Sequence, residues 1–252
     1  MDNGISGIIN SLVLSTKEIN VKELPTQGLF YPKNFKLAIK KASIDDVLLY
    51  NFNYIKDDIS VILSETKRII KNNIILPKKY KYEDLKSNDL LYIFFEIVKF
   101  TMSRDIMVPY EDILGRTSYV AFNTENFNYY DYNSMKCDYN EKTREFEKDG
   151  YRFSLPSVGV ENCLVDYLYT LEEKKDIDKN YDFIFFLGNK NKLKKSEIEN
   201  LITIFNDDLD EKEKEKVNKI VKLIYPSIGY SLKSGNKIIS LDLKIDFEKL
   251  FI

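Results

Sequence analysis

The residue types that carry most enzymatic chemistry are scarce in this sequence. None of the 252 residues is a histidine. This absence removes the histidine-dependent triads, the Cys–His dyads and most catalytic zinc sites. Cys137 and Cys163, the two cysteines, are too few and too far apart for a zinc ribbon or a disulfide framework. We interpret them as two thiols in a reducing compartment. The sequence also lacks the glycine-rich phosphate-binding motifs GxGxxG and GxxxxGK[ST].

Carboxylates offer the remaining route to chemistry, and one acidic cluster could hold a cation. Its members are Asp207, Asp208, Asp210 and Glu211. The cluster lacks the EF-hand spacing and its loop glycine, and it lies between two expected helices, so helix capping explains it better. Asp131 and Asp138 lie in an aromatic loop, and Arg104 beside Asp105 could form a local ion pair. An enzyme that uses carboxylates stays open, but no motif in the sequence favours it.

The composition is that of a soluble globular protein, with 44% hydrophobic and 31% charged residues. The 38 basic and 40 acidic side chains give a net charge of −2, which provides no electrostatic case for a nucleic-acid or membrane partner. The apolar stretch from Ile5 to Leu14 is far shorter than the ~20 residues of a transmembrane helix. We therefore expect no membrane segment, no direct nucleic-acid partner and no cofactor.

Several elements must position any site in the first half of the chain. Phe35, Leu37 and Ile39 alternate with polar or small residues, as in a half-buried strand. Ser43 is a candidate N-cap for a helix that would carry Ile44, Val47 and Leu48 inward. A second helix is predicted from the stripe of Ile59, Ile62, Leu63, Thr66, Ile69 and Ile70, with Pro77 beyond its end. A third helix is predicted to open at Ser87, beside Asp89, and to bury Leu90, Leu91, Phe94, Ile97 and Val98.

The second half of the chain combines strands with helices. Residues 119–155 are aromatic and polar, and the pair Asp149-Gly150 between two aromatic segments predicts a β-hairpin. Ser196 followed by Glu199 is the pattern of a capping box. The charged segment 208–226 predicts a helix with a solvated face, and Val217, Ile220, Val221 and Ile224 on its inner side. Strict alternation over 239–247 predicts a C-terminal strand that pairs with its own sheet or with a neighbouring subunit.

These elements predict an α+β protein in which amphipathic helices pack on a small, mostly antiparallel sheet with an aromatic-rich β insert. The expected organisation is an N-terminal arm over 1–20 and a strand plus three-helix unit over 21–118. The aromatic β insert follows over 119–160, and a helical segment with the C-terminal strand occupies 161–252.

The aromatic segment is a candidate partner interface. Residues 119–134 contain no lysine or arginine, which disfavours single-strand nucleic-acid binding. Tyrosine and phenylalanine are enriched at protein interfaces, but they also pack small β cores, and the sequence leaves both interpretations open. The candidate contact residues are Phe122, Phe127, Tyr129, Tyr130 and Tyr132.

The stretch LPTQGLFYPKNFKLAIKKASIDDVLLYNF, then KRIIKNNIILP and YEDLKSNDLLYIFFEI, resembles the baseplate hub proteins of T4-like contractile-tailed phages. The matching positions are Leu24, Pro25, Thr26 and Gly28 in a turn, Asp45, Asp46, Leu48 and Leu49 in a helix, Lys71 and Asn72, and then Asp89, Leu90, Tyr92 and Phe94. The closing DLKIDFEKLF is similar to the acidic-aromatic last strand of that family. The chain departs from the family in having aspartates where glutamates are expected at 45–46, and its aromatic insert has no counterpart.

The resemblance implies a structural role in the virion and no catalytic residue. It predicts a component of the central hub of the tail baseplate, assembled in the host cytoplasm. Its implied partners are other hub subunits and tube-initiation, spike or tape-measure proteins. A transient tail-assembly chaperone is the alternative. If the chain is a hub component, we expect Leu24, Gly28 and Tyr31 to shape a turn near a partner surface, with Gly28 at positive φ.

Overall fold

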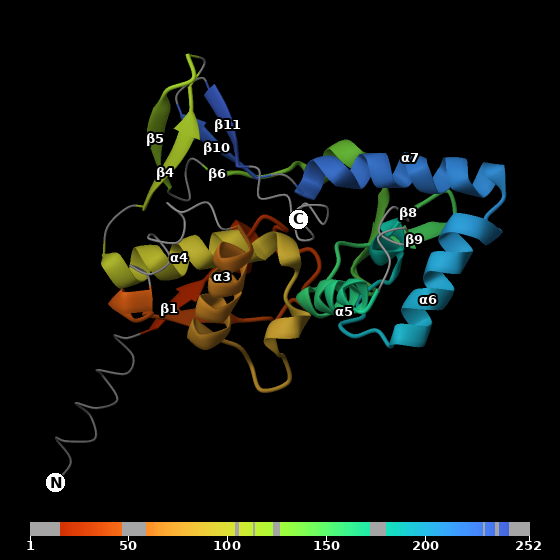
Figure 1. Ribbon diagram of the computed structural model, residues 1–252, viewed down its shortest axis with the longest axis horizontal. Helices are drawn as coiled ribbons and strands as arrows, with labels where there is room; N and C mark the ends of the chain where they lie inside the picture. The colour runs from red at the N-terminus through yellow and green to blue at the C-terminus, as the bar shows by residue number, and fades with distance from the viewer. Residues whose placement is uncertain are drawn as a thin grey trace, which may run out of the picture.

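The computed structural model describes residues 16–46, 59–103, 106–112, 114–122, 127–171, 180–228, 230–234 and 237–241. Helices and small antiparallel sheets alternate along the chain (Figure 1), which confirms the predicted α+β class. In these parts of the chain, no helix combines the length and the apolar character needed to cross a membrane.

The first sheet is antiparallel, in the order β1-β2-β3, and its strands are β1 (Thr16–Ile19), β2 (Leu37–Lys40) and β3 (Ile74–Ile75). The central strand shows the predicted alternation. Leu37 and Ile39 are buried, as is Phe35 just before the strand, while Lys36 and Lys40 are exposed. The apolar side of β2 faces the helices that follow.

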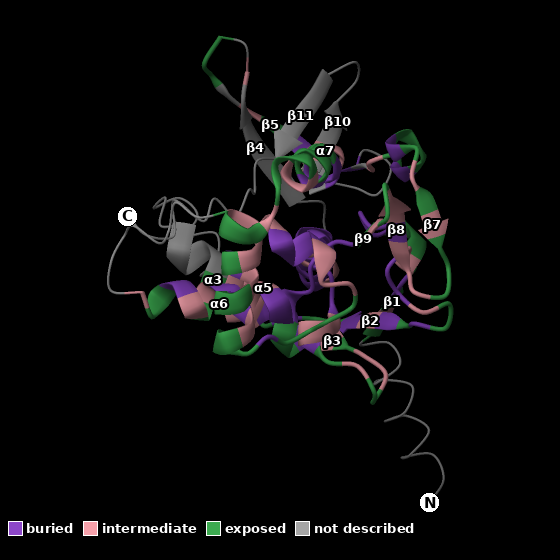
Figure 2. Cartoon of the chain, turned by 90° about the vertical axis from the view of Figure 1, so that its right-hand side faces the viewer, coloured by how far each residue is buried: buried purple, intermediate pink, exposed green. Residues whose placement is uncertain are grey.

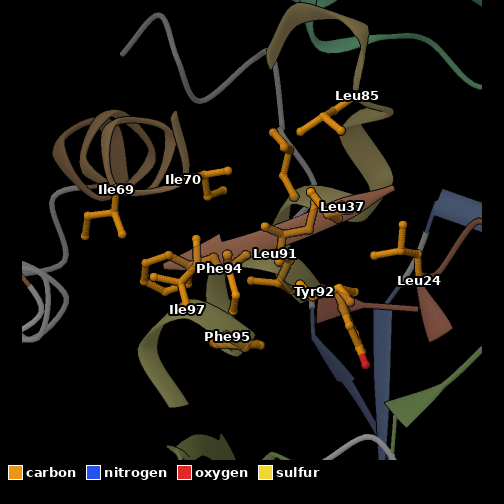
Figure 3. Packing of buried hydrophobic residues seen from close by; sticks show 14 of the residues in the cluster. Leu24, Leu37, Ile69, Ile70, Leu85, Leu91, Tyr92, Phe94, Phe95 and Ile97 are labelled. Atoms are coloured by element: carbon orange, nitrogen blue, oxygen red, sulfur yellow. The ribbon is translucent and has the colours of Figure 1, made fainter. Parts of the chain in front are cut away.

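Two long helices cover this sheet, α3 (Ile59–Asn73) and α4 (Leu90–Met102). Ile69 and Ile70 carry the predicted α3 stripe into the core. The short turn η3 (Ser87–Asp89) leads directly into α4, as predicted. The expected apolar positions of α4 are buried together with Tyr92 and Phe95, so almost the whole helix lies inside (Figure 3).

The helix predicted after Ser43 is described only at its start. The Asp46 N–H donates to Ser43 Oγ at 3.1 Å, which confirms Ser43 as the cap. The prediction that Ile44 points inward is wrong, because its side chain is 59% exposed. Ala42 occupies the buried place instead, and its N–H donates to Thr101 Oγ1 at 2.9 Å. Positions 47 and 48 lie outside the described residues.

The middle of the chain is a series of short strands. They are β4 (Ile106–Glu111), β5 (Thr117–Phe122), β6 (Phe127–Asn128), β7 (Asp138–Asn140), β8 (Glu145–Lys148) and β9 (Tyr151–Phe153). The β4–β5 hairpin projects from the body (Figure 1), and β7, β8 and β9 form one sheet. Asp149 and Gly150 both have positive φ in the two-residue β8–β9 turn, which confirms the predicted hairpin.

The last part of the chain is helical and ends in a hairpin. Its elements are α5 (Val158–Tyr169), η6 (Asp182–Phe186), α6 (Lys195–Thr203), the π-helical turn η7 (Ile204–Asp208), α7 (Glu211–Ile228), β10 (Tyr230–Ser234) and β11 (Lys237–Leu241). The four predicted apolar positions of α7 are buried. The strand β11 pairs with β10, and β10 with β6, so the described part of the predicted C-terminal strand pairs within this chain.

The capping box predicted at Ser196 and Glu199 is wrong by two residues. The Lys194 N–H donates to Glu197 Oε2 at 2.8 Å, so α6 begins at Lys195. Leu193 and Ile198 explain the shift. They flank the cap at the positions of a hydrophobic staple, and both are buried in the same cluster.

The buried side chains form two hydrophobic clusters. The first joins β1, β2, α3 and α4 to Phe127 and Val158. The second joins the β7–β9 sheet to α5, α6 and α7. Buried residues gather toward the centre of the molecule, while α6 and α7 carry many exposed residues (Figure 2). The aromatic segment contributes to both clusters, since Phe127 belongs to the first and Tyr132 to the second.

Candidate functional site

The turn of the LPTQG segment is a type I′ β-turn over Thr26–Leu29. The Leu29 N–H donates to the Thr26 carbonyl at 3.0 Å, and the central residues Gln27 and Gly28 have φ of 52° and 74°. A Cβ added at Gly28 would lie 3.2 Å from Val21 Cγ2. Both the positive φ and this contact require glycine, which confirms the predicted conformation of Gly28.

The Asp89 carboxylate anchors this turn from the start of α4. Asp89 is fully buried. Its Oδ1 accepts the Thr26 N–H at 3.0 Å, and its Oδ2 accepts the Thr26 hydroxyl at 2.8 Å and the Tyr31 hydroxyl at 2.6 Å. Three donors from Thr26 and Tyr31 therefore satisfy a buried carboxylate that is about 60 positions away in the sequence.

Lys86 completes the arrangement. The Lys86 side chain is also buried, and its Nζ donates to the Leu155 carbonyl at 2.7 Å and lies 5.4 Å from the centre of the Phe30 ring. The Lys86 backbone N–H donates to the Tyr31 hydroxyl at 2.9 Å. We refer to Thr26, Tyr31, Lys86 and Asp89 as the Asp89 junction.

Burial dominates the electrostatics of the junction. It raises the pKa of Asp89 to about 6, although the hydrogen bonds from Tyr31 and Thr26 and the charge of Lys86 oppose the rise. It lowers the pKa of Lys86 to about 8, and the Asp89 charge opposes that change. Hydrogen bonds within the chain satisfy both groups, and the opposite charges of Asp89 and Lys86 each favour the charged form of the other.

The junction is built to hold the fold together. Asp89 is fully buried and its oxygens accept three hydrogen bonds from the chain itself, so no substrate has access to them. Lys86 ties α4 to the segment before α5, and the Val158 N–H donates to the Leu85 carbonyl at 2.8 Å in the same region. The arrangement fixes the shape of the turn and joins the two halves of the chain.

The predicted interface residues lie around this junction, largely inside the protein. Leu24, Tyr31, Phe127 and Tyr132 are buried. Tyr129 and Tyr130 are half-buried, and the side chain of Phe122 lies outside the described residues. The structure brings the turn and the aromatic segment together, because Gln27 Nε2 donates to the Tyr130 carbonyl at 2.7 Å. Their role at a partner interface stays a prediction.

Ring packing explains the burial of the aromatic segment. Phe127 meets Tyr92 edge to face with ring centres 5.4 Å apart, and Tyr132 stacks on Phe146 at 5.8 Å. The core-packing interpretation is therefore confirmed for Phe127 and Tyr132.

The candidate carboxylates serve local structure. Asp210 Oδ1 accepts the Glu213 N–H at 2.8 Å at the start of α7, which confirms capping as its role. Asp131 caps the turn η4 (Tyr132–Met135) by accepting the Asn133 N–H at 3.0 Å. Asp207 and Asp208 are exposed in η7, and Asp138 is exposed in β7. No group of three potential metal ligands gathers among the described residues.

The remaining candidates carry little chemistry. Cys137 and Cys163 are half-buried free thiols, and burial raises the pKa of Cys137. Arg104 and Asp105 lie outside the described residues. Sequence reasoning did not single out Lys86, because a lysine in a polar KSND segment gives no local sign of burial. Its role depends on Tyr31 and Leu155, which are far away in the sequence.

The fold and the site define an α+β protein whose two hydrophobic clusters meet at a buried polar junction. Comparison with protein-family models, curated proteins and solved structures finds no match for this chain.

Proposed function

We propose that the protein is a structural component of the central hub of a contractile phage tail baseplate and acts through protein–protein contacts. The proposal starts from the resemblance of the LPTQG-to-IFFEI segment to hub proteins. The observation that carries it is that Leu24, Thr26, Gly28 and Asp89, which carry that resemblance, form one connected motif. Thr26 and Asp89 are 63 positions apart and share two hydrogen bonds.

This connection gives the resemblance a physical meaning. Local patterns such as an apolar stripe recur by chance in unrelated helices. Here the turn requires Gly28, and the buried Asp89 carboxylate requires the donors of Thr26 and Tyr31. The fold therefore constrains several distant positions at once. The positions that carry the resemblance are therefore linked physically in this chain, and this link supports the proposal.

The proposed partners are other hub subunits and the tube-initiation, spike or tape-measure proteins. The proposed location is the tail baseplate of the virion, after assembly in the host cytoplasm. The proposal gives the protein no catalytic step, because the described candidate carboxylates cap helices, support the junction or lie exposed and apart.

Quantitative mass spectrometry of purified virions tests this role. We expect the chain at a few copies per particle, in a constant ratio to the spike and tape-measure proteins. Presence in the infected-cell lysate but not in particles would replace the proposal with a transient assembly chaperone. If the gene belongs to no tailed particle, the hub assignment is wrong. Particles made without the gene provide the control, and they should lack a complete baseplate.

A further inference from the structure

Two lysine-rich loops that are far apart in the sequence lie side by side. The first, residues 77–84, connects β3 to the start of α4, and the second, residues 188–195, leads into α6. Both loops run along the same side of α5 (Figure 1). Asn191 Nδ2 donates to Asp84 Oδ1 between the loops.

The start of α5 holds the loops in this position. Ser157 Oγ, at the cap of α5, donates to the Lys190 carbonyl at 2.9 Å. Gly159 in the first turn of α5 leaves no room for a Cβ between Asn191 and Glu83, which come from the two loops. The juxtaposition is thus a built part of the fold, with close backbone packing on both sides.

The two adjoining loops carry seven exposed lysines, and we call this set the lysine face. All of its lysines are exposed, and they are Lys78, Lys79, Lys81, Lys190, Lys192, Lys194 and Lys195. Lys190 pairs with Glu197 at 3.4 Å and Lys195 pairs with Glu199 at 4.0 Å. The other lysines of the face have no ion pair with any residue in the described ranges. Their charges are available to a partner.

The pattern of charges indicates which polyanion the face fits. Nucleic acid presents a phosphate at every nucleotide, so acidic groups within a binding surface oppose it. Here the carboxylates of Glu83, Asp84 and Glu197 lie among the lysines. The face also contains no arginine, the residue that grips phosphate with two parallel hydrogen bonds. A protein segment with separate carboxylates can meet the lysines and avoid the acidic groups.

We propose that the lysine face is a docking surface for an acidic segment of a partner protein. The net charge of −2 does not reveal these lysines, because it sums the charges of the whole chain. Complementary charge at such a surface raises the rate of encounter and selects the partner. The inference rests on the described loops and not on the proposed tail role, so either can fail without the other.

The test measures binding of a fluorescein-labelled, glutamate-rich peptide to the full chain by fluorescence anisotropy. A short duplex DNA is the competing probe, and both are measured at low salt, where exposed charges act most strongly. The test variant reverses four lysines without an ion pair and is K78E/K79E/K192E/K194E. The control variant makes the same change of net charge on exposed lysines elsewhere and is K36E/K40E/K212E/K216E.

We expect the peptide to bind the unaltered chain and the control variant with similar affinity. The test variant should lose about tenfold or more in affinity, because four attractive contacts become repulsive. Circular dichroism of all three proteins verifies that they are equally folded. Three results would each overturn the inference: no binding of the peptide, an equal loss in the control variant, or tighter binding of DNA than of peptide through the same lysines.

Discussion

Replacement of Tyr31 by phenylalanine should destabilise the protein while leaving its packing intact. The ring of residue 31 stacks on Phe35 with centres 4.5 Å apart, and phenylalanine preserves that contact. The variant removes only the hydroxyl, which donates to Asp89 Oδ2 at 2.6 Å and accepts the Lys86 N–H at 2.9 Å. The perturbation therefore falls on the hydrogen bonds of the Asp89 junction.

The expected loss of stability can be worked out from the two hydrogen bonds of the Tyr31 hydroxyl. A hydrogen bond to a charged group contributes ~1.5–3 kcal/mol, and a buried N–H left without an acceptor costs ~1–3 kcal/mol. With partial relaxation of the junction, we expect Y31F to lower the free energy of unfolding by ~2–4 kcal/mol. That is a large share of the ~5–15 kcal/mol that stabilises a typical domain.

Urea unfolding followed by circular dichroism measures this loss, because the chain has no tryptophan to report by fluorescence. Y119F is the matched control, since the Tyr119 side chain is 61% exposed, and it should change stability by less than ~0.5 kcal/mol. The loss in Y31F should also shrink near pH 5, where Asp89 takes up a proton and needs its donors less. If Y31F matches Y119F, the junction does not stabilise the fold as argued.

Three further outcomes follow from the same region and from α6. Gly28→Val should lower the free energy of unfolding by ~2–4 kcal/mol or prevent folding, because valine disfavours the positive φ and its Cβ would crowd Val21. An unchanged thermal unfolding curve would contradict this. Stability should rise by on the order of 2 kcal/mol as pH falls from 7 to 5, because the folded state binds more protons than the unfolded state over that range. Burial raises the pKa of Asp89 to about 6, and it raises the pKa of Glu161, in the first turn of α5, to about 7. Urea titrations at several pH values measure this change, and a loss of stability over that range would refute it. Glu197→Ala should lower the free energy of unfolding by ~0.5–1.5 kcal/mol, because it removes the side chain that caps α6. Thermal unfolding measures this loss, and no change would mean that the cap does not support the helix.

Elements with a local sequence signal could be predicted well. The stripe that ends in Ile69 and Ile70, the alternation around Leu37 and the Asp149-Gly150 turn each depend on residues within one element. The local pattern at Ser196 and Glu199 places the start of α6 two residues too late. Leu193, held in the second cluster, decides where that helix begins, and this is a tertiary contact.

Neither the Asp89 junction nor the lysine face can be predicted from local sequence patterns, because both bring together residues that are far apart in the chain. Nothing near Asp89 in the sequence indicates that Thr26 will satisfy it, and the composition averages the lysines of two loops with acidic residues elsewhere. The sequence alone does not decide whether the aromatic segment lies in the core or at an interface, because its residue types suit both. Only the ring contacts of Phe127 and Tyr132 in the folded chain place them in the core.

The placement of Phe30 and Tyr31 has a consequence for synthesis on the ribosome. These adjacent residues belong to different hydrophobic clusters, and the Phe30 ring packs on Tyr132 and Phe146 with centres 6.0 Å from each. The first cluster likewise needs Val158. A nascent chain that has just completed α4 therefore contains the main partners of Tyr31 but lacks both ring partners of Phe30. The Phe30 ring can therefore reach its packed position only after more than half of the polypeptide has left the exit tunnel.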